Sequence, residues 1–360
     1  MTSVALVNAS GRLDGITFGS RPILEALQDL GFSVTWYQCV DRGVDPFLPP
    51  GARTVPGSNF PWRGVAMGLN RLWTFPRGLR EVRSDIVLLS DPTLVRIARD
   101  HPTTVVKVHD LRPLSPYADR TTTRWMFRYA MPHLRRVPRI LVTTETMART
   151  LGSWGVAPHR VRVVPDTHSL GLHPEHVPTS VERVSSTGKV RVLCVSTDRP
   201  YKNLELYLRL IQAMQKRAPP ERFEFTLVST LREPTRLRVA ALGPGALRVI
   251  DSVDDMTSVY AEADVLVHPS LYEGFGRQIV EAMAFGLPVL AVGTPTVAEV
   301  LGGAGFLLDA GTLDPWVDAL LSLADTDRLS RVATRSLERG RDFLPERFQA
   351  ALEEALRGLP

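Results

Sequence analysis

The sequence is poor in cysteine, in lysine and in long apolar runs. Its two cysteines, Cys39 and Cys194, fall in what we expect to be different domains, so no disulfide framework is predicted and a reducing cytoplasm fits. No window reaches about 18 uninterrupted apolar residues, so no membrane-spanning helix is predicted. The first residues, MTSVALVNASGRL, lack a basic segment followed by a long apolar one, and no signal peptide is expected.

Motifs of several nucleotide-dependent and cofactor-dependent enzymes are also missing. The glycines after the first predicted strand do not form G-x-G-x-x-G, so the dinucleotide fingerprint is absent and a nicotinamide dehydrogenase is disfavoured. No Asp-x-Asp pair stands out that would demand a metal, so neither a metal nor a cofactor is expected. A pyridoxal-phosphate phosphorylase would need a lysine in the C-terminal half, where lysines are sparse. No basic run interleaves with a known nucleic-acid-binding motif, which argues against nucleic acid as a partner.

What the sequence does contain fits a soluble globular protein of two domains. The chain has 360 residues, enough for two cores, and its hydrophobic share of 44% is ordinary. The formal net charge is +5 and the isoelectric point about 9.5, with the excess carried by arginine. This charge favours anionic ligands or an anionic membrane surface.

Short apolar runs alternate with helical patterns along the chain, which is typical of βαβ units. We therefore predict an α/β protein with two Rossmann-like domains that face each other across a cleft. The expected parts are an N-terminal domain over 1–178, a C-terminal domain over 179–340, and a C-terminal helix over 341–360 that packs back on the N-terminal domain. Residues 169–189 are predicted to be the linker. Residues 44–80 are expected to form loops and a helix around 64–80, and helices are expected over about 314–325 and 328–357.

The most informative stretch is DVLVHPSLYEGFGRQIVEAMAFGLP, residues 264–288. An apolar strand, a Gly-rich loop and a helical pattern follow one another, and Gly286 with Pro288 marks the helix end. Glu273 lies in the loop and Glu281 in the helix. A helical spacing of eight residues would separate them by roughly 12 Å, which suits a long polar ligand held at both ends, with an anion at the helix N-terminus. The alternative is an ordinary α/β loop with two surface glutamates.

Two positions in the N-terminal half have two interpretations each. His109 follows the predicted strand 104–108, at the edge where open α/β sheets place ligands. The alternative is a histidine that caps a helix or faces water. Gly15 lies in the loop after the first strand, either beside a bound phosphate or acceptor or as an ordinary turn residue.

Residues 119–139, DRTTTRWMFRYAMPHLRRVPR, combine six arginines with aromatic side chains. Part of this stretch is predicted to be a basic amphipathic helix that is broken near Pro132. One interpretation is a patch that lies on anionic lipid headgroups. The other is an ordinary helix with a solvated basic face and its aromatic residues in the core.

The segments HPSLYEGFGRQIVEAMAFGLPVLA, TPTVAEVL and GFLLDAGT closely resemble the donor-binding segment of retaining glycosyltransferases of GT-B fold, the large "group 1" family (glycosyltransferase family 4-like). The family's mark is a pair of glutamates with seven residues between them, which Glu273 and Glu281 match. The resemblance is looser in the N-terminal half, where VKVHD, VTTET and VVPD carry it. It implies transfer of a hexose from a UDP- or GDP-sugar to an acceptor hydroxyl, with retention of the anomeric configuration and without a metal.

The resemblance also implies roles for the residues of the central stretch. Glu273 would hold hydroxyls of the donor sugar near the reacting carbon. The backbone of Gly274, Phe275 and Gly276 would contact the sugar and the phosphate. Glu281 would bind the ribose hydroxyls.

Residues outside that stretch receive implied roles as well. Lys202 matches the family lysine that grips the diphosphate, and His109 resembles the histidine that faces the donor sugar. By spacing from Lys202, the family's Gly-Arg pair falls on Ser196 and Thr197, so Arg199 is expected to supply the guanidinium from a shifted position. The family's PNG reads Pro-Asp-Thr at 165–167, which adds a negative charge.

The acceptor and the location follow as broader expectations. The acceptor is expected to be a carbohydrate or a lipid-linked compound, and residues 119–139 are a candidate contact with an anionic membrane surface. The expected location is the cytoplasm, with peripheral binding at the inner face of the membrane. Two alternatives stay open: another GT-B sugar-nucleotide enzyme, such as an epimerase, and a non-catalytic protein that binds sugar nucleotides. Donor hydrolysis or transfer would separate the enzyme from the binding protein.

Overall fold

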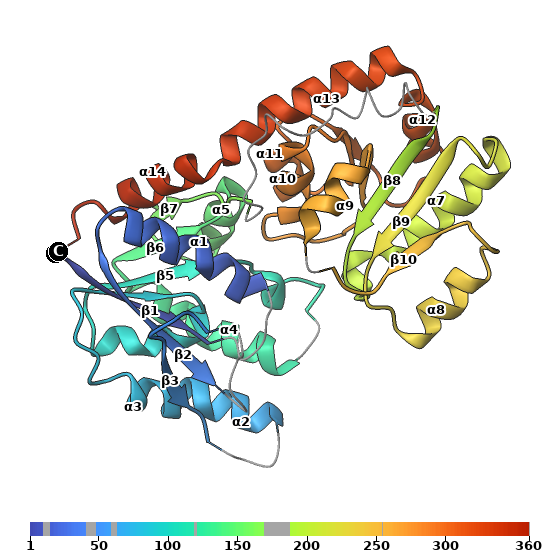
Figure 1. Ribbon diagram of the computed structural model, residues 1–360. Coiled ribbons are helices and arrows are strands. Elements are labelled where there is room, and N and C mark those ends of the chain that lie inside the picture. Colours follow the sequence, from blue (N-terminus) through green and yellow to red (C-terminus); the bar gives the residue numbers. More distant parts are fainter. Residues whose placement is uncertain are drawn as a thin grey trace. The chain divides into compact units, whose positions relative to one another are not determined.

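The computed structural model describes residues 1–9, 15–40, 48–58, 63–118, 121–168, 188–253 and 255–359. The chain divides into two compact units, one formed by Met1–Ser169 with Pro345–Pro360 and the other by Leu170–Leu344 (Figure 1). We call them unit 1 and unit 2 and describe each by itself. The predicted linker over 169–189 lies almost entirely outside the described residues.

Unit 1 is built on a seven-stranded parallel sheet with the strand order β3-β2-β1-β4-β5-β6-β7. The chain moves outward from β1 to β2 and β3, and then returns to β4 beside β1, so the strand order reverses between β1 and β4. Open α/β sheets bind ligands at such a reversal. The strands are β1 (Ser3–Asn8), β2 (Ser33–Val40), β3 (Arg53–Pro56), β4 (Ile86–Leu89), β5 (Thr104–Val108), β6 (Arg139–Val142) and β7 (Val161–Val163).

Helices cover both faces of the unit 1 sheet. One face packs against α1 (Gly15–Asp29) and the C-terminal helix α14 (Pro345–Leu356), which share one core with β1 and β4. The other face packs against the remaining helical segments, whose apolar residues form a second core. These segments are α2 (Arg63–Leu69), the π-helix η1 (Asn70–Thr74), α3 (Phe75–Gly78), the 3-10 helix η2 (Pro92–Arg99), η3 (Arg112–Leu114), α4 (Thr121–Leu134), α5 (Glu145–Ser153) and η4 (Pro158–Arg160).

The structure differs from the sequence-based expectation at two places in unit 1. The helix expected around 64–80 is present, because α2, η1 and α3 follow one another without a break from Arg63 to Gly78, but the edge strand β3 before it was not expected. Only Val55 of β3 is buried, so the strand carries almost no apolar signal, and its terminal Pro56 is tolerated because an edge strand needs fewer donors. Helix α4 also continues past Pro132 to Leu134. The proline removes one backbone hydrogen bond, while buried Met131 and Leu134 keep the helix end packed.

Unit 2 is built on a six-stranded parallel sheet with the order β10-β9-β8-β11-β12-β13. The chain moves outward from β8 to β9 and β10 and returns to β11 beside β8, so this sheet also has a reversal, between β8 and β11. Val265 and Leu266 of β11 pair with Val192 and Leu193 of β8. The strands are β8 (Val190–Val195), β9 (Phe223–Val228), β10 (Arg248–Ile250), β11 (Val265–His268), β12 (Val289–Val292) and β13 (Phe306–Leu308).

Two cores also sandwich the sheet of unit 2. The helical segments are η6 (Pro200–Lys202), α7 (Leu204–Arg217), α8 (Glu233–Ala240), α9 (Met256–Glu262), α10 (Arg277–Ala284), α11 (Pro295–Leu301), α12 (Asp314–Ser322), α13 (Thr326–Gly340) and η7 (Arg341–Phe343). The single helix expected over 328–357 is wrong, because α13 ends at Gly340 and α14 begins at Pro345. Proline fits the first turn of a helix but not its interior. Both cysteines are buried, and neither forms a disulfide. None of the helices in the described ranges is long and apolar enough to cross a membrane.

Candidate functional site

The reversal point of unit 2 brings two loops together at the carboxyl edge of its sheet. The loop after β8 leads into η6 and then α7, and the loop after β11 leads into α10. The Leu271 N–H donates to the Tyr201 carbonyl at 2.8 Å, so the two loops are directly joined. Most of the predicted donor residues lie on these two loops, because parallel strands present their carboxyl ends at one edge.

A buried polar cluster connects the loops. Lys202 Nζ lies 2.7 Å from Glu273 Oε1, and His268 Nε2 lies 2.9 Å from the same oxygen. The side chains of Lys202 and Glu273 are only 12% and 10% exposed. Burial alone would raise the pKa of Glu273, but the Lys202 ammonium and the close His268 imidazole outweigh it, so the net shift of this pKa is downward. Glu273 is therefore an ionised carboxylate paired with the buried ammonium of Lys202.

His268 is a site residue that the sequence analysis did not assign. It is the last residue of β11 and is 2% exposed. Its place at the carboxyl end of a buried strand, five residues before Glu273, was the available signal. Lys202 and His268 both contact one carboxylate oxygen of Glu273, Oε1, which restricts the orientation of that side chain.

The Gly-rich loop presents backbone rather than side chains. Gly276 has a φ of 95° and caps α10, a left-handed conformation that other residues rarely adopt. Phe275 is buried and packs edge-to-face on Phe343, with ring centroids 5.6 Å apart. The Phe275 side chain is therefore part of the core, and only backbone atoms of this residue are available to a ligand. The anchored loop places the N-terminal end of α10 at the edge of the sheet.

Glu281 lies inside α10 and is tightly held. The Tyr260 hydroxyl donates to Glu281 Oε2 at 2.7 Å, and Arg277 Nη2 lies 3.7 Å from Oε1. Tyr260 is fully buried, and this burial, followed by the negative charge of Glu281, raises the pKa of its hydroxyl well above the ordinary value. Tyr260 therefore remains a hydrogen-bond donor and fixes one carboxylate oxygen of Glu281.

The loop after β8 holds the remaining predicted residues of unit 2. Arg199 precedes η6 and is exposed, and its guanidinium makes no hydrogen bond or ion pair with other described residues. Ser196 is half-buried, and its N–H donates to the Val228 carbonyl at 3.0 Å. Asn203 adopts a left-handed conformation with a φ of 52° at the start of α7. In this loop Lys202 contacts Glu273, while Arg199 lies at the surface.

In unit 1 the two predicted residues belong to neighbouring elements. Gly15 is the first residue of α1, and His109 directly follows β5. A Cβ atom on Gly19 of α1 would lie 2.8 Å from His109 Cε1, so the imidazole packs closely on the start of this helix. A side chain at position 19 would therefore require the imidazole of His109 to shift.

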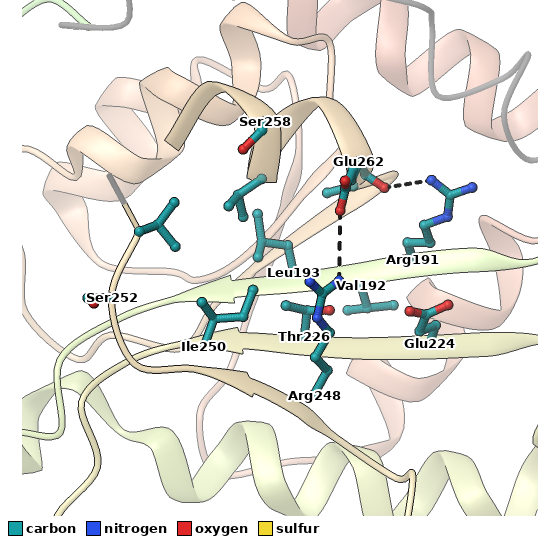
Figure 2. A pocket seen from close by; sticks show the side chains of 13 residues that line it. Arg191, Val192, Leu193, Glu224, Thr226, Arg248, Ile250, Ser252, Ser258 and Glu262 are labelled. Atoms are coloured by element: carbon teal, nitrogen blue, oxygen red, sulfur yellow. Dashed lines mark hydrogen bonds and ion pairs between the residues drawn. The ribbon is translucent and has the colours of Figure 1, made fainter. Parts of the chain in front are cut away.

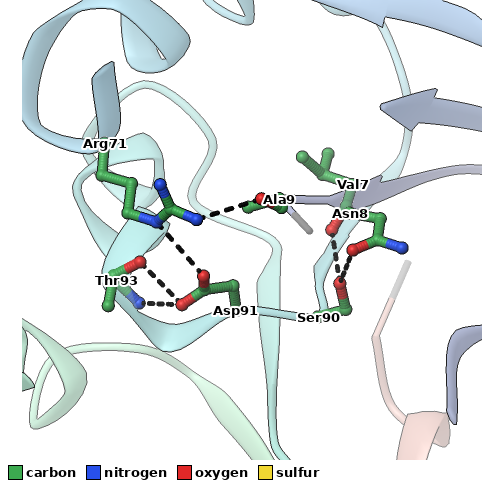
Figure 3. Close-up of polar contacts among 7 residues, drawn as sticks. All are labelled: Val7, Asn8, Ala9, Arg71, Ser90, Asp91 and Thr93. Carbon is green, nitrogen blue, oxygen red and sulfur yellow. Dashed lines mark hydrogen bonds and ion pairs between the residues drawn. The ribbon is translucent and has the colours of Figure 1, made fainter. Parts of the chain in front are cut away.

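A second polar cluster, which the sequence analysis missed, lies at the reversal point of unit 1 (Figure 3). Arg71, on the π-helix η1, donates from Nη2 to the Ala9 carbonyl at 3.0 Å, and its Nε lies 3.5 Å from Asp91 Oδ2. The Ser90 hydroxyl is shared between two acceptors, the Val7 carbonyl at 3.1 Å and Asn8 Oδ1 at 3.3 Å. π-Helical turns often occur at functional sites. The cluster joins the ends of β1 and β4, and its members are too far apart in sequence to form a motif.

A cavity of about 280 Å³ lies elsewhere in unit 2, under α9 and over the strands β8, β9 and β10 (Figure 2). Its charged rim is internally paired, since Arg248 Nη1 lies 3.8 Å from Glu262 Oε2 and Arg191 donates to the Glu262 carbonyl. None of the predicted donor residues lines it. The cluster around Glu273 therefore remains the candidate site.

Comparison with known proteins identifies the class that this fold and site define, which is a glycosyltransferase of GT-B fold. The profile of the family described as "Glycosyl transferases group 1" matches residues 189–326, and that of the "Glycosyl transferase 4-like domain" matches residues 14–167. The chain belongs to the group 1 glycosyltransferases. This result confirms the family and the fold class that the resemblance implied.

Two curated relatives and two solved structures illustrate the similarity. The chain is 29% identical over 216 residues to the MMP alpha-(1->4)-mannosyltransferase of Mycolicibacterium hassiacum, covering 58% of this chain and 47% of that protein. It is 27% identical over 219 residues to the D-inositol 3-phosphate glycosyltransferase of Corynebacterium efficiens, covering 56% and 51%. The match thus spans about half the length of these relatives.

The solved structures are similar over nearly the whole chain. Anabaena HepE in complex with UDP superposes with a TM-score of 0.77 at 18% identity, covering 99% of this chain and 100% of that one. Sucrose-phosphate synthase from Thermosynechococcus elongatus superposes with a TM-score of 0.78 at 19% identity, covering 100% and 99%. At these identities the likeness establishes the shared fold.

Proposed function

We propose that this protein transfers a hexose from a nucleoside-diphosphate sugar to an acceptor hydroxyl, with retention of the anomeric configuration and without a metal. The observation that carries the proposal is the buried cluster of Lys202, Glu273 and His268 at the reversal point of unit 2. Its placement beside the start of α10 supports binding of a diphosphate, because a helix N-terminus favours an anion. Group 1 family membership supports the same reaction class.

The chemistry requires stabilisation of the leaving diphosphate as it departs from the anomeric carbon. Fixed cations and N–H donors aimed at the phosphate lower the energy of that transition state. Lys202 carries a compact positive charge with three ammonium donors, one of which contacts Glu273, and we propose that this charge also attracts a phosphate oxygen. Arg199, exposed and unpaired among the described residues, offers a bidentate contact.

The two carboxylates serve the two ends of the donor in this proposal. Glu273 binds sugar hydroxyls, since an ionised carboxylate held by two partners is a fixed hydrogen-bond acceptor. Glu281 binds ribose hydroxyls through Oε1, because Tyr260 occupies Oε2. For His109 the proposal keeps the role at the donor sugar that the resemblance implies. The acceptor then attacks on the face that the diphosphate leaves, and a leaving phosphate oxygen takes the acceptor proton.

The nature of the donor is tested by thermal unfolding with a panel of UDP-, GDP- and ADP-sugars. A ligand present at about 100 times its Kd adds about 2.7 kcal/mol of stability, which raises the Tm by roughly 5–10 °C for a unit of this size. We expect a UDP- or GDP-sugar to give this shift. The shift should disappear in Lys202→Met. It should remain in the control Lys216→Met, since Lys216 is an exposed residue of α7. Absence of a shift with every sugar nucleotide would overturn the proposal.

Retention, metal independence and catalysis need a turnover assay. We expect release of the nucleoside diphosphate, with or without transfer, to continue in excess EDTA, and we expect the product anomer determined by NMR to match that of the donor. Inhibition by EDTA that added metal reverses would refute metal independence, and an inverted product would refute retention. Binding without any donor consumption would favour the non-catalytic alternative.

A lipid-linked or anionic acceptor, and a cytoplasmic location with peripheral binding at the inner face of a membrane, complete the proposal. The support is the basic helix α4, whose 14 residues include arginines and no acidic residue. The name of one relative, the D-inositol 3-phosphate glycosyltransferase, includes a phosphorylated compound, and an anionic acceptor for this chain is in keeping with it.

A further inference from the structure

Unit 1 carries an arginine-lined pocket outside the stretch 119–139. The pocket has a volume of about 360 Å³ and lies between η1 with α3 on one side and η2 on the other. Four arginines line it against one acidic residue, Asp100. The arginines are Arg77, Arg80, Arg96 and Arg99. Like charges gathered at one site repel each other, so this arrangement favours an anionic ligand.

The contacts in the pocket divide the arginines into two pairs. Arg96 donates to the Leu72 carbonyl at 3.1 Å, and Arg80 Nε lies 3.5 Å from Asp100 Oδ2. Arg77 and Arg99 are exposed, and neither guanidinium makes a hydrogen bond or an ion pair with other described residues. The first pair therefore shapes the pocket, and the second pair is available to an oxyanion, for which arginine has a matching fork of donors.

Exposed tryptophans lie at the pocket and on the helix that packs on η2. Trp73 lines it, lies under the Arg96 guanidinium at 5.1 Å and is 56% exposed. Helix α4 packs on η2 and carries Trp125, which is 54% exposed. Trp125 stacks on Tyr129 at 5.8 Å, and Tyr129 contacts His133 at 5.2 Å, so the rings form a ladder along α4.

His133, at the C-terminal end of α4, is under the influence of the arginines of η2. The pKa of His133 is lowered first by burial and then by the positive charges of Arg99, Arg96 and Arg136. The positive charges of Arg96 and Arg99 on η2 therefore act on His133, which lies on α4, the helix that packs on η2. Because α4 packs on η2, we group the pocket residues with Trp125 of α4 under the name basic aromatic face.

This combination of side chains points to the interface of a membrane. Large exposed aromatic residues are unusual on a soluble protein and mark interaction sites. Indole rings settle at the headgroup level, with an apolar body and a polar N–H, while arginines bind the phosphates of anionic lipids. Nucleic acid would also engage the arginines, but neither a helix positioned for a groove nor a known binding motif supports it.

We propose that the basic aromatic face docks on an anionic membrane surface, with a lipid phosphate in the pocket between Arg77 and Arg99 and with Trp73 and Trp125 at the headgroup level. This inference deepens the membrane part of the proposed function and does not involve the residues of unit 2. It also moves the main anchoring contacts from the stretch 119–139 to η1, α3 and η2.

Vesicle co-sedimentation of the full chain, without donor or acceptor, tests this surface. The probes are vesicles of pure phosphatidylcholine and vesicles that contain phosphatidylglycerol. The test variant is Arg77→Gln with Arg99→Gln, and the charge-matched control is Arg331→Gln with Arg335→Gln, two exposed arginines on α13. Each arginine near an anionic surface contributes about 1 kcal/mol, so the test variant should bind roughly 30-fold more weakly. Trp73→Ser with Trp125→Ser should weaken binding as well.

Several results would overturn the proposal. No binding of the wild type to anionic vesicles would do so, and so would equal losses in the test and control variants, which would indicate only the net positive charge. Displacement from the vesicles by inorganic phosphate, beyond the effect of chloride at equal ionic strength, would assign the pocket to a free anion. Tighter binding of single-stranded RNA would assign it to nucleic acid. A nucleotide-induced Tm shift is measured separately, so failure of membrane docking and failure of donor binding can be distinguished.

Discussion

Replacement of Lys202 by methionine tests the electrostatics of the unit 2 cluster. Its ammonium lies 2.7 Å from Glu273, and the two side chains are 12% and 10% exposed, so solvent screens the pair little. Removal of one partner leaves a buried charge without compensation, which costs about 3–5 kcal/mol. His268 still contacts the carboxylate, so we expect the lower end, about 3 kcal/mol. This loss lowers the Tm by roughly 6–12 °C for a unit of this size.

A double-mutant cycle isolates the pair from other effects of the substitution. The cycle combines Lys202→Met and Glu273→Gln, singly and together. Because the chain has two units, the unfolding of unit 2 is monitored by the hydrogen exchange of peptides from α10. We expect a coupling energy above about 2 kcal/mol. The matched control is the pair Arg217 and Asp314, also 2.7 Å apart but with side chains 46% and 75% exposed. Exposed pairs are worth about 0–1 kcal/mol.

The same pair sets the pH dependence of unit 2. The pKa of Glu273 is lowered in the folded state, so ionisation stabilises the fold above the unfolded pKa of about 4.3, and this contribution is lost as the pH falls through the folded pKa. Without Lys202, the burial that raises the pKa of Glu273 prevails. In the Lys202→Met variant, the free energy of unfolding should therefore decrease as the pH rises through this raised pKa. Equal coupling in the buried and exposed pairs, together with identical pH profiles, would refute the reasoning.

Three further substitutions test other parts of the site. Gly19→Ala should displace His109 and lower turnover at least about tenfold, with little change in Tm, whereas Gly68→Ala on α2, where a Cβ meets no atom within 4 Å, should leave turnover unchanged. Equal turnover of the two variants would argue against a role for His109. Tyr260→Phe should destabilise the protein by about 1.5–3 kcal/mol in urea unfolding, because it removes a buried hydrogen bond to a charged carboxylate. A loss below about 0.5 kcal/mol would contradict that contact. Arg71→Gln should lower the Tm of unit 1, and Asp91→Asn should restore part of the loss, since the second change removes the stranded charge. Additive losses would show that the two residues do not interact.

The sequence was sufficient for the parallel strands and for the strand–loop–helix unit around Glu273, because buried strands leave apolar runs and glycines mark the turns. The same local signals failed for β3, where a single buried residue, Val55, carries the strand. They also failed at the break between α13 and α14, where Pro345 starts a new helix inside a region of continuous helical pattern. Local periodicity reports burial along one element and does not report where a neighbouring element interrupts it.

Local sequence patterns did not predict the contacts between residues that are distant in the sequence, and these contacts form much of the candidate site. The role of His268 depends on the position of Lys202, which lies on a different loop of the reversal point. The cluster of Arg71 and Asp91 joins two elements of unit 1 that no motif links. The arginine pocket beside Trp73 likewise combines η1, α3 and η2. These arrangements follow from strand order and helix packing, which are properties of the folded chain.

Hydrogen exchange with and without a saturating nucleoside diphosphate, UDP or GDP as the thermal panel indicates, tests donor binding at the unit 2 cluster most directly. Slower exchange is predicted in the peptides that cover 196–204 and 268–284, the two loops joined at the reversal point with the start of α10. The Lys202→Met variant should show no such protection at the same nucleotide concentration. Protection confined to other parts of unit 2, or undiminished protection in that variant, would contradict a diphosphate site built on Lys202 and Glu273.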